Sequence, residues 1–332
     1  MTAPLTIRTG RAGSRIAGVG SYLPHRIVTN EEMCTMIDSS DEWIQQRTGI
    51  VERRWASDDE PLSYMVAEAS RRAIEASKVS TDDIDAVILA SVTHLKATPA
   101  LAPILAAELG LKDPAAYDIS AACAGFCYAL AQADALIRTG SATNVLIVGA
   151  ERLSDLTDKS DRSTAFLFAD GAGAAVVVGS DTPGVGPVVW GSDGTQADVI
   201  TQTEDFRDAV PAGRMPTVYM DGKPVFRWAT TFIADAARDI LKQTGIEPEQ
   251  LDVFIPHQAN NRITDSMLRH LKLPEHVVVA RSIKHFGNTS ASSIPIAMDE
   301  LLRSGEAHSG QTALIIGFGA GLVYAGQVVV LP

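Results

Sequence analysis

A cysteine, a histidine and an asparagine, widely separated along the chain, could together catalyse a reaction at a thiol. Cys123 lies in the small-residue run AACAGFC, His257 follows a strand-like run, and Asn288 lies in GNTS. A thiolate is a nucleophile, and an imidazole and an amide can donate hydrogen bonds to a developing oxyanion. Together they predict a nucleophile with two oxyanion-stabilising donors. Taken singly, each residue also fits a structural role, as a small buried hydrophobe, a core histidine and a helix cap.

Cys127, four positions after Cys123, is the nearest alternative partner for the nucleophile. A redox pair normally has two intervening residues, and a zinc site needs a second pair of ligands. We therefore expect Cys127 to be a packing residue and expect no bound metal. With Cys34 the chain has only three cysteines, too few for a disulfide framework, which favours a reducing, cytoplasmic compartment.

Buried-strand patterns alternate with helix-period segments along the whole chain. The strand-like runs cover residues 85–91, 144–150, 173–179, 252–257, 312–319 and 326–332. This alternation predicts an α/β layered fold. His257 emerges at the carboxyl end of its predicted strand, which is the edge where open α/β sheets bind ligands.

The sequence also aligns with itself. Residues 68–88 match 235–255 at a shift of 167, residues 122–140 match 287–305 at 165, and residues 144–149 match 312–317 at 168. This repetition predicts two similar halves, 1–185 with the nucleophile and 186–332 with His257 and Asn288.

The self-alignment places Cys123 opposite Asn288, each at the start of its copy of one helix. Backbone N–H groups and the positive end of the helix dipole favour a thiolate there, so we expect a lowered pKa for Cys123. Two copies packed about a pseudo-twofold axis would bring both helix starts to one centre. We expect Gly140 and Gly305 to end the two helices.

Charge and motif content exclude several classes of protein. A net charge of −12 argues against binding to nucleic acid or anionic membranes, and no apolar stretch of about 18 residues suggests a membrane span. The glycine-rich runs at 171–176 and 317–322 lack the third glycine of a dinucleotide-binding loop. They instead favour close approach of backbone to a ligand or of the two runs to each other.

Six stretches carry a family resemblance: DSSDEWIQQRTGI (38–50), DISAACAGF (118–126), DRSTAFLFADGAGAA (161–175), PHQANNRI (256–263), GNTSASS (287–293) and GFGAGL (317–322). From about residue 14 to its end the chain resembles the β-ketoacyl-acyl-carrier-protein synthase III family, in an actinobacterial-like form. That resemblance implies a thiolase-like fold, a five-layer α-β-α-β-α arrangement of two duplicated halves. It also implies a homodimer.

The resemblance implies a condensing enzyme that starts fatty-acid synthesis without a cofactor. An acyl group would pass from acyl-CoA to Cys123 and then condense with malonyl-acyl-carrier protein with loss of CO2. His257 and Asn288 would complete a catalytic triad, and the backbone N–H groups of Cys123 and Ala320 would form the oxyanion hole.

The resemblance assigns further residues to binding. The coenzyme A contacts would be Trp43, Arg47, Arg162, Gly222, Ala259 and Asn260, and the carrier-protein docking residues would be Arg227, Arg262 and Arg269. Without the resemblance, Trp43 would be a helix core residue and the arginines solvated surface charge. Thr98 stands where many members have a phenylalanine that closes the partner subunit's acyl pocket, which predicts room for branched or longer acyl chains.

Alternative functions differ in what they require. A thiolase needs a second, C-terminal cysteine, and none follows Cys127; a hydroxymethylglutaryl-CoA synthase needs a glutamate that residues 90–100 lack. A papain-like protease would leave the duplication unexplained, and a non-enzymatic acyl-binding module would not need His257 and Asn288. A priming ketosynthase or acyltransferase of a polyketide or secondary-metabolite pathway keeps the same triad and stays open.

Overall fold

The structure, a computed structural model, describes residues 5–332 and contains two five-stranded sheets. The first comprises β1 (Gly13–Tyr22), β4 (Ala86–Ala90), β5 (Ala115–Ile119), β6 (Asn144–Arg152) and β7 (Asp170–Ser180). The second comprises β8 (Val189–Ser192), β11 (Val253–Pro256), β12 (Val278–Val279), β13 (Thr312–Gly319) and β14 (Val323–Val330). All six predicted strands are confirmed, with small shifts at their ends.

The two sheets have the same topology. Their strand orders are β1-β7-β6-β4-β5 and β8-β14-β13-β11-β12. In each, the first three strands pair antiparallel and the last three pair parallel. Matching order and direction over five strands confirm the predicted duplication. The boundary between residues 185 and 186 remains a prediction.

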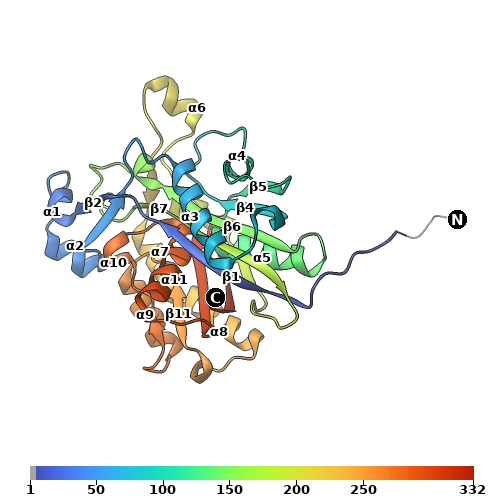
Figure 1. The fold of residues 1–332 in the computed structure, drawn as a ribbon. Helices are drawn as coiled ribbons and strands as arrows, with labels where there is room; N and C mark the ends of the chain where they lie inside the picture. The colour runs from blue at the N-terminus through green and yellow to red at the C-terminus, as the bar shows by residue number, and fades with distance from the viewer. Residues whose placement is uncertain (1–4) are drawn as a thin grey trace.

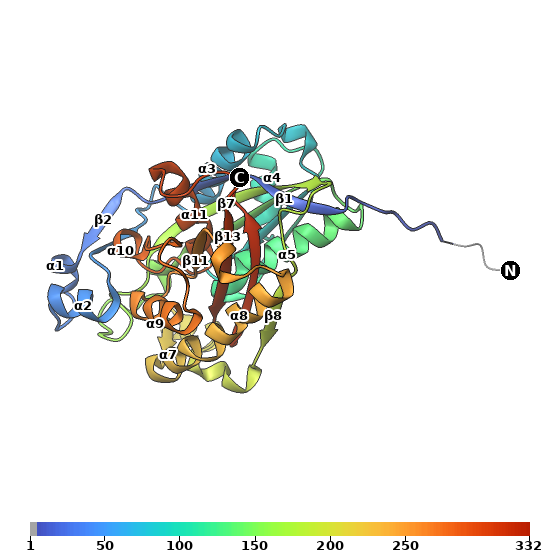
Figure 2. The ribbon, with the colours of Figure 1, turned by 90° about the horizontal axis from the view of Figure 1, so that it is seen from below.

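Helices cover both faces of both sheets. The helices are α1 (Asn30–Met33), α2 (Asp41–Thr48), α3 (Leu62–Ser77), α4 (Leu101–Glu108), α5 (Gly125–Arg138), α6 (Phe206–Ala209), α7 (Gly222–Thr230), α8 (Phe232–Thr244), α9 (Asn261–Leu271), α10 (Ile283–Phe286) and α11 (Ser293–Ser304). Two short pairs complete the strands, β2 (Arg26–Thr29) with β3 (Glu52–Trp55) and β9 (Ile200–Gln202) with β10 (Val218–Met220). Figure 1 and Figure 2 show α5 and α11 inside the body and α8 and α9 on its outer face.

Three hydrophobic clusters account for the layers. One lies between the sheets and contains α5, α11 and the inner strand residues, such as Ile88 and Ile315. A second joins α3 and α4 to the outer face of the first sheet, and a third joins α8 and α9 to the outer face of the second. Strand residues alternate between these clusters, as a sheet buried on both faces requires. The predicted five-layer α-β-α-β-α fold is therefore confirmed.

The central helices α5 and α11 begin and end in similar ways. Each follows a three-residue 3₁₀ turn, η2 (Ala122–Ala124) or η7 (Ser290–Ser292), whose first residue has a positive φ, 43° at Ala122 and 51° at Ser290. Gly140 and Gly305 lie just beyond the helices with φ of 73° and 76°, as expected for glycines that end helices.

The equivalent turns correct one detail of the self-alignment. Aligning η2 with η7 places Cys123 opposite Ala291, whereas Asn288 lies before η7. The sequence alignment was wrong at this end because α5 has 14 residues and α11 has 12, so one shift cannot fit both ends of the helix.

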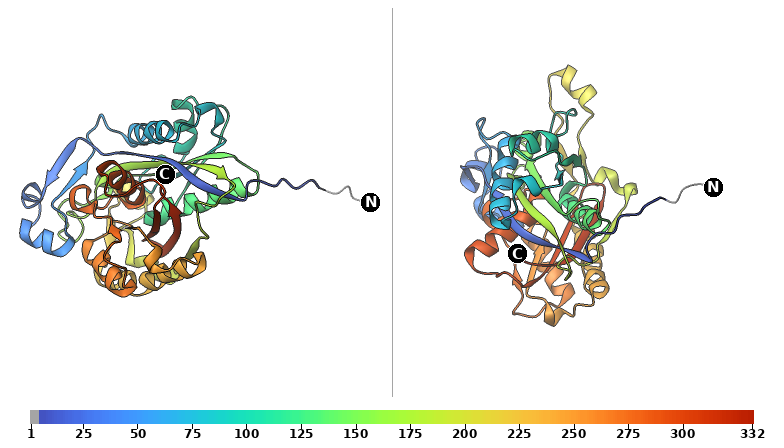
Figure 3. Two further views of the ribbon diagram at one scale, coloured as in Figure 1. Left: turned by 60° about the horizontal axis from the view of Figure 1, so that its bottom comes forward. Right: turned by 45° about the vertical axis from the view of Figure 1, so that its right-hand side comes forward.

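Two segments project from the layered body. Figure 3 shows α1, α2 and β2 grouped at one end, and α6 on a separate extension. From residue 5 the described chain lies away from the body in Figures 1, 2 and 3, and it reaches the body where the N–H of Gly10 donates to the carbonyl of Arg138 at 3.1 Å. Within residues 5–332, no helix combines the length and hydropathy needed to cross a membrane.

Candidate active site

Strand β13 packs directly against Cys123. A Cβ added at Gly319 would lie 2.9 Å from both Sγ and Cβ of Cys123, and one at Gly317 would lie 2.8 Å from Cα of Ala124. Only glycine lets the strand approach η2 this closely. The sequence predicts that the 317–322 run approaches a ligand or the 171–176 run; the segment that Gly317 and Gly319 approach in the structure is η2.

The other half repeats this packing. A Cβ at Gly149 of β6 would lie 2.4 Å from the carbonyl oxygen of Ala291 in η7. Each central strand therefore supports the 3₁₀ turn contributed by the opposite half, and η2 and η7 contact each other between them. The duplication brings both turns to one centre, as the sequence predicts.

The protonation state of Cys123 differs from the expectation. Burial raises the pKa of its thiol to about 12; a hydrogen bond from Ser290 opposes this and the carboxyl of Glu151 adds to it. The lowered pKa expected from the helix start was wrong, because loss of water around the sulfur outweighs the local backbone dipoles. The residue as a whole is of intermediate exposure, and the raised pKa favours the neutral thiol.

His257 is held as a neutral imidazole at the end of β11. It is 3% exposed, and burial lowers its pKa to about 3. Nδ1 lies 2.7 Å from Oγ of Ser293, and that oxygen also accepts the backbone N–H of Gln258 at 3.3 Å. We therefore assign the Ser293 proton to the bond with Nδ1, which places the ring proton on Nε2. The edge of Phe318 packs against the ring at a centroid distance of 5.3 Å.

Asn288 is fixed by its backbone and by its own amide oxygen. Its N–H donates to Leu167 at 2.9 Å, and its carbonyl accepts from Ala169 at 2.9 Å. Oδ1 accepts the N–H of Ser290 at 2.9 Å, so the amide NH2 is the end left to donate. Ser290 thus lies between Asn288 and the Cys123 sulfur.

The predicted oxyanion-hole residue Ala320 follows Gly319 directly. The Cβ position of Gly319 is 3.0 Å from the backbone nitrogen of Cys123, so the chain at 319–320 runs beside that N–H. Cys127, in contrast, is fully buried in the core between the sheets. Among residues 5–332, no three His, Cys, Asp or Glu side chains are grouped as a metal site.

Three of the residues predicted to contact coenzyme A, Trp43, Arg47 and Arg162, lie together. The guanidinium carbon of Arg162 lies 5.3 Å from the Trp43 ring centroid, and that of Arg47 lies 6.0 Å away. Phe166 supports the ring edge-on at 5.4 Å. The guanidinium of Arg162 thus lies over the Trp43 ring.

The other residues predicted to contact coenzyme A are Gly222, Ala259 and Asn260, and they do not form a cluster like that of Trp43 and the two arginines. Gly222 begins α7 with open space around its Cβ position, and Ala259 lies in the turn after His257, donating its N–H to that residue's carbonyl at 2.9 Å. The Asn260 side chain caps α9 through the N–H of Arg262 and donates to the carbonyl of Arg47 at 3.2 Å. A structural role for Asn260 is therefore evident.

Thr98 and the three predicted docking arginines lie at the surface. Thr98 is exposed in the loop between β4 and α4. Arg227 of α7 and Arg262 and Arg269 of α9 are exposed, and α7 packs against α9. Arg262 lies 5.3 Å from the Phe226 ring, and none of the three arginines forms an ion pair within residues 5–332.

The structure adds three polar residues that sequence reasoning missed: Glu151, Ser290 and Ser293. Glu151 is fully buried at the carboxyl end of β6. A charged residue ending an apolar strand was the available signal for Glu151. The two serines lie within GNTSASS, but their type and spacing fit helix capping as well as catalysis.

Comparisons with known proteins agree with this geometry. Residues 117–194 match the family model of 3-oxoacyl-[acyl-carrier-protein] synthase III, and residues 241–331 match that of its C-terminal part. The β-ketoacyl-[acyl-carrier-protein] synthase III of Streptomyces glaucescens is 54% identical over 97% of this chain and 98% of its own length.

Solved structures of proteins from the same family are also similar to this chain. The priming β-ketosynthase of the R1128 polyketide pathway superposes with a TM-score of 0.97 at 48% identity, covering 99% of each chain. The 3-oxoacyl-[acyl-carrier-protein] synthase III of Aquifex aeolicus gives 0.88 at 38% identity, covering 96% of this chain and 100% of its own. The chain therefore belongs to the 3-oxoacyl-[acyl-carrier-protein] synthase III family and is a condensing acyltransferase.

Proposed function

We propose that Cys123 takes an acyl group from acyl-CoA and passes it to the carbanion formed when malonyl-acyl-carrier protein loses CO2. The product is a 3-oxoacyl-carrier protein, the first condensation product of fatty-acid synthesis. The observation that carries the proposal is the convergence of η2, η7 and the 319–320 turn around the Cys123 sulfur.

In the first step the Cys123 thiol attacks the thioester carbonyl and coenzyme A leaves. The backbone N–H groups of Cys123 and Ala320 are suited to stabilise the oxyanion, because they are fixed before the reaction begins. In the second step decarboxylation places negative charge on the malonyl thioester oxygen. The Nε2–H of His257 and the amide NH2 of Asn288 can donate hydrogen bonds to that oxygen. Because both groups are neutral, they do not hold back the malonyl carboxylate, which must leave as CO2.

Mass spectrometry of the intact protein tests this function. Exposure to mixed acyl-CoA esters should add one acyl group at Cys123, and malonyl-acyl-carrier protein should remove it as the 3-oxoacyl product. A Cys123→Ser variant should retain no thioester adduct. Absence of any adduct on Cys123 in the native protein would overturn the proposal.

The acyl groups retained in the same experiment also report on substrate range, which in this proposal depends on a neighbouring subunit. We propose a homodimer, supported by the exposed apolar residues Val92, Leu95 and Ile104 near the edge strand β5. Thr98 of one subunit would then border the acyl pocket of the other, with room for branched or longer chains. Retention of acetyl alone would contradict this role for Thr98.

We also propose a cytoplasmic location, which the three free cysteines support.

Carrier-protein docking is proposed for the face formed by Arg227, Arg262 and Arg269. In a chain of net charge −12, these three exposed arginines, which form no ion pair within residues 5–332, make a local basic face for an acidic partner. Arg262→Glu should lower kcat/KM for malonyl-acyl-carrier protein about tenfold and leave acylation by acyl-CoA unchanged. Steady-state assays of both half-reactions measure this, and equal losses in both would contradict the docking role.

A priming reaction of a polyketide pathway is the second candidate, favoured by the 48% identity to the R1128 priming ketosynthase. Both pathways use the same chemistry and differ in the carrier protein. Supplying malonyl groups on a fatty-acid carrier and on a polyketide carrier in the assay above separates them, because the native partner should give the higher kcat/KM.

A further inference from the structure

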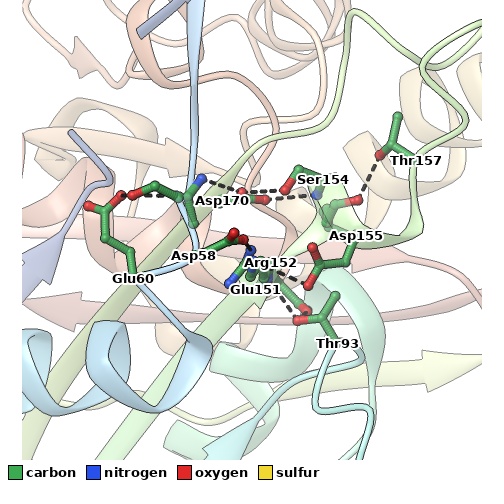
Figure 4. Close-up of polar contacts among 12 residues, drawn as sticks. Asp58, Glu60, Thr93, Glu151, Arg152, Ser154, Asp155, Thr157 and Asp170 are labelled. Atoms are coloured by element: carbon green, nitrogen blue, oxygen red, sulfur yellow. Dashed lines mark hydrogen bonds and ion pairs between the residues drawn. The ribbon is translucent and has the colours of Figure 1, made fainter. Parts of the chain in front are cut away.

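Glu151 is a buried carboxyl behind the nucleophile. Its side chain is 0% exposed, and four residues direct hydrogen-bond donors at it: Ser91, Val92, Thr93 and Ser290. The bond from Thr93 Oγ1 is 2.8 Å and that from Ser290 Oγ is 3.1 Å. Figure 4 shows Glu151 and Thr93 together at the end of the strand. So many donors around one carboxyl indicate that it carries charge for part of its working cycle.

Ser290 connects this carboxyl to the reacting sulfur. Its hydroxyl donates to Glu151 Oε1 at 3.1 Å, and its backbone N–H fixes the amide of Asn288. It belongs to η7, which contacts the η2 turn that carries Cys123, and both Ser290 and Glu151 act on the pKa of the Cys123 thiol. A serine hydroxyl has one proton, so it can donate to the carboxyl or to the sulfur, but not to both at once. When it donates to Glu151, its lone pairs are free to accept the thiol proton.

We propose that Ser290 and Glu151 form a proton relay for Cys123, with Glu151 holding the thiol proton while the acyl-enzyme exists. This rests on the proposed function, because it assigns the proton released in that function's first step. Glu151 acts through Ser290 and does not itself contact substrate.

The proton and electron pairs balance over the two steps. In acylation the S–H bond of Cys123 breaks and its proton passes to Ser290 as the Ser290 proton passes to Glu151. The sulfur electron pair forms the bond to the acyl carbon, and the carbon–sulfur bond to coenzyme A breaks, releasing its thiolate. In condensation the carbanion displaces the Cys123 thiolate, which regains its proton from Glu151 through Ser290.

The relay also fits the electrostatics of condensation. Malonate brings a carboxylate and decarboxylation forms an enolate, both close to Cys123. A second negative charge at Glu151 would oppose both, whereas a protonated Glu151 would not. Burial raises the pKa of Glu151 to about 7, so both forms are accessible near neutral pH.

Other charges near Glu151 are engaged elsewhere. Arg152, the next residue of β6, pairs with Asp155 at 3.2 Å and Asp58 at 3.9 Å, as Figure 4 shows. On the adjacent loop, His94 Nε2 lies 3.2 Å from the carbonyl of Pro99. Asp170 of the neighbouring strand accepts hydrogen bonds from Ser154 and Ala56. Cys123 is thus the titratable group linked to Glu151 through Ser290.

Single-turnover acylation by acyl-CoA, followed by mass spectrometry across pH, tests the relay. The native rate should rise with an inflection near pH 7 as Glu151 ionises. Glu151→Gln keeps the size of the side chain but accepts no proton, so the rate should fall about 10²-fold at neutral pH. Its remaining rate should rise about tenfold per pH unit, following only the thiolate fraction.

Two further variants separate the relay from folding. Ser290→Ala should give a similar loss, and the double variant should lose little more, because both changes break one path. Asp170→Asn removes another buried carboxylate outside the relay and should acylate within about twofold of native. An unchanged rate and inflection in Glu151→Gln would overturn the relay alone. Failure of the native protein to acylate would overturn the proposed function and the relay together.

Discussion

Replacing His257 by alanine is expected to slow condensation about 10²- to 10³-fold while Cys123 still becomes acylated. The imidazole is neutral because burial lowers its pKa to about 3, and Ser293 directs its proton to Nε2. The variant loses a fixed donor to the enolate, and removal of one such donor typically costs about 2.7–4 kcal/mol of transition-state stabilisation. Release of CO2 from malonyl-acyl-carrier protein measures the effect.

Two comparisons make this result specific. Asn288→Ala should show a loss of similar size, because it removes the second donor to the same oxygen. His276→Ala removes a histidine whose ring contacts the carbonyl of Leu251 and should leave condensation unchanged. A native rate of CO2 release in His257→Ala would exclude this residue as an enolate donor.

The same substitution should change how stability depends on pH. Folding lowers the pKa of His257 from 6.5, so below pH 6.5 the unfolded chain binds a proton that the folded chain does not. The native protein therefore loses stability as pH falls from 7 to 5, by about 2 kcal/mol from this residue. The alanine variant lacks that contribution, and denaturant unfolding at both pH values measures the difference.

The sequence predicted the layers and the nucleophile because both depend on local patterns. Runs such as NVLIVGA identify strands buried on both faces, and their recurrence in the second half identifies the duplication. Cys123 and His257 were found because each stands at the end of a predicted element, where ligands meet α/β sheets.

What the sequence missed depends on contacts between distant residues. Glu151 and Ser290 are 139 positions apart, and their hydrogen bond exists only because the two halves pack together. The predicted lowering of the Cys123 pKa was wrong because it, too, ignored contacts that form only when the two halves pack together. A helix start is visible in sequence, whereas the loss of water around a sulfur is a property of the assembled core.

Gly319→Ala is expected to lower acylation of Cys123 at least about 10²-fold. The new Cβ would lie 2.9 Å from Sγ and Cβ of Cys123, closer than these atoms can approach, so the sulfur or the strand must move. β13 cannot move back easily, because it pairs with a strand on each side. A displacement of about 1 Å at the reacting atom can cost 10²-fold in rate.

A matched glycine distinguishes this steric effect from a general loss of flexibility. Among residues 5–332 no atom lies within 4 Å of the Cβ position of Gly194, and its φ is not positive, so Gly194→Ala should acylate at the native rate. Alkylation by iodoacetamide, which needs no coenzyme A site, should fall in Gly319→Ala if the sulfur itself is obstructed. Native alkylation combined with slow acylation would instead mean that the substitution displaces the oxyanion hole at Ala320. Native rates of both reactions would show that η2 yields to the added methyl group, and that Gly319 does not set the position of the nucleophile.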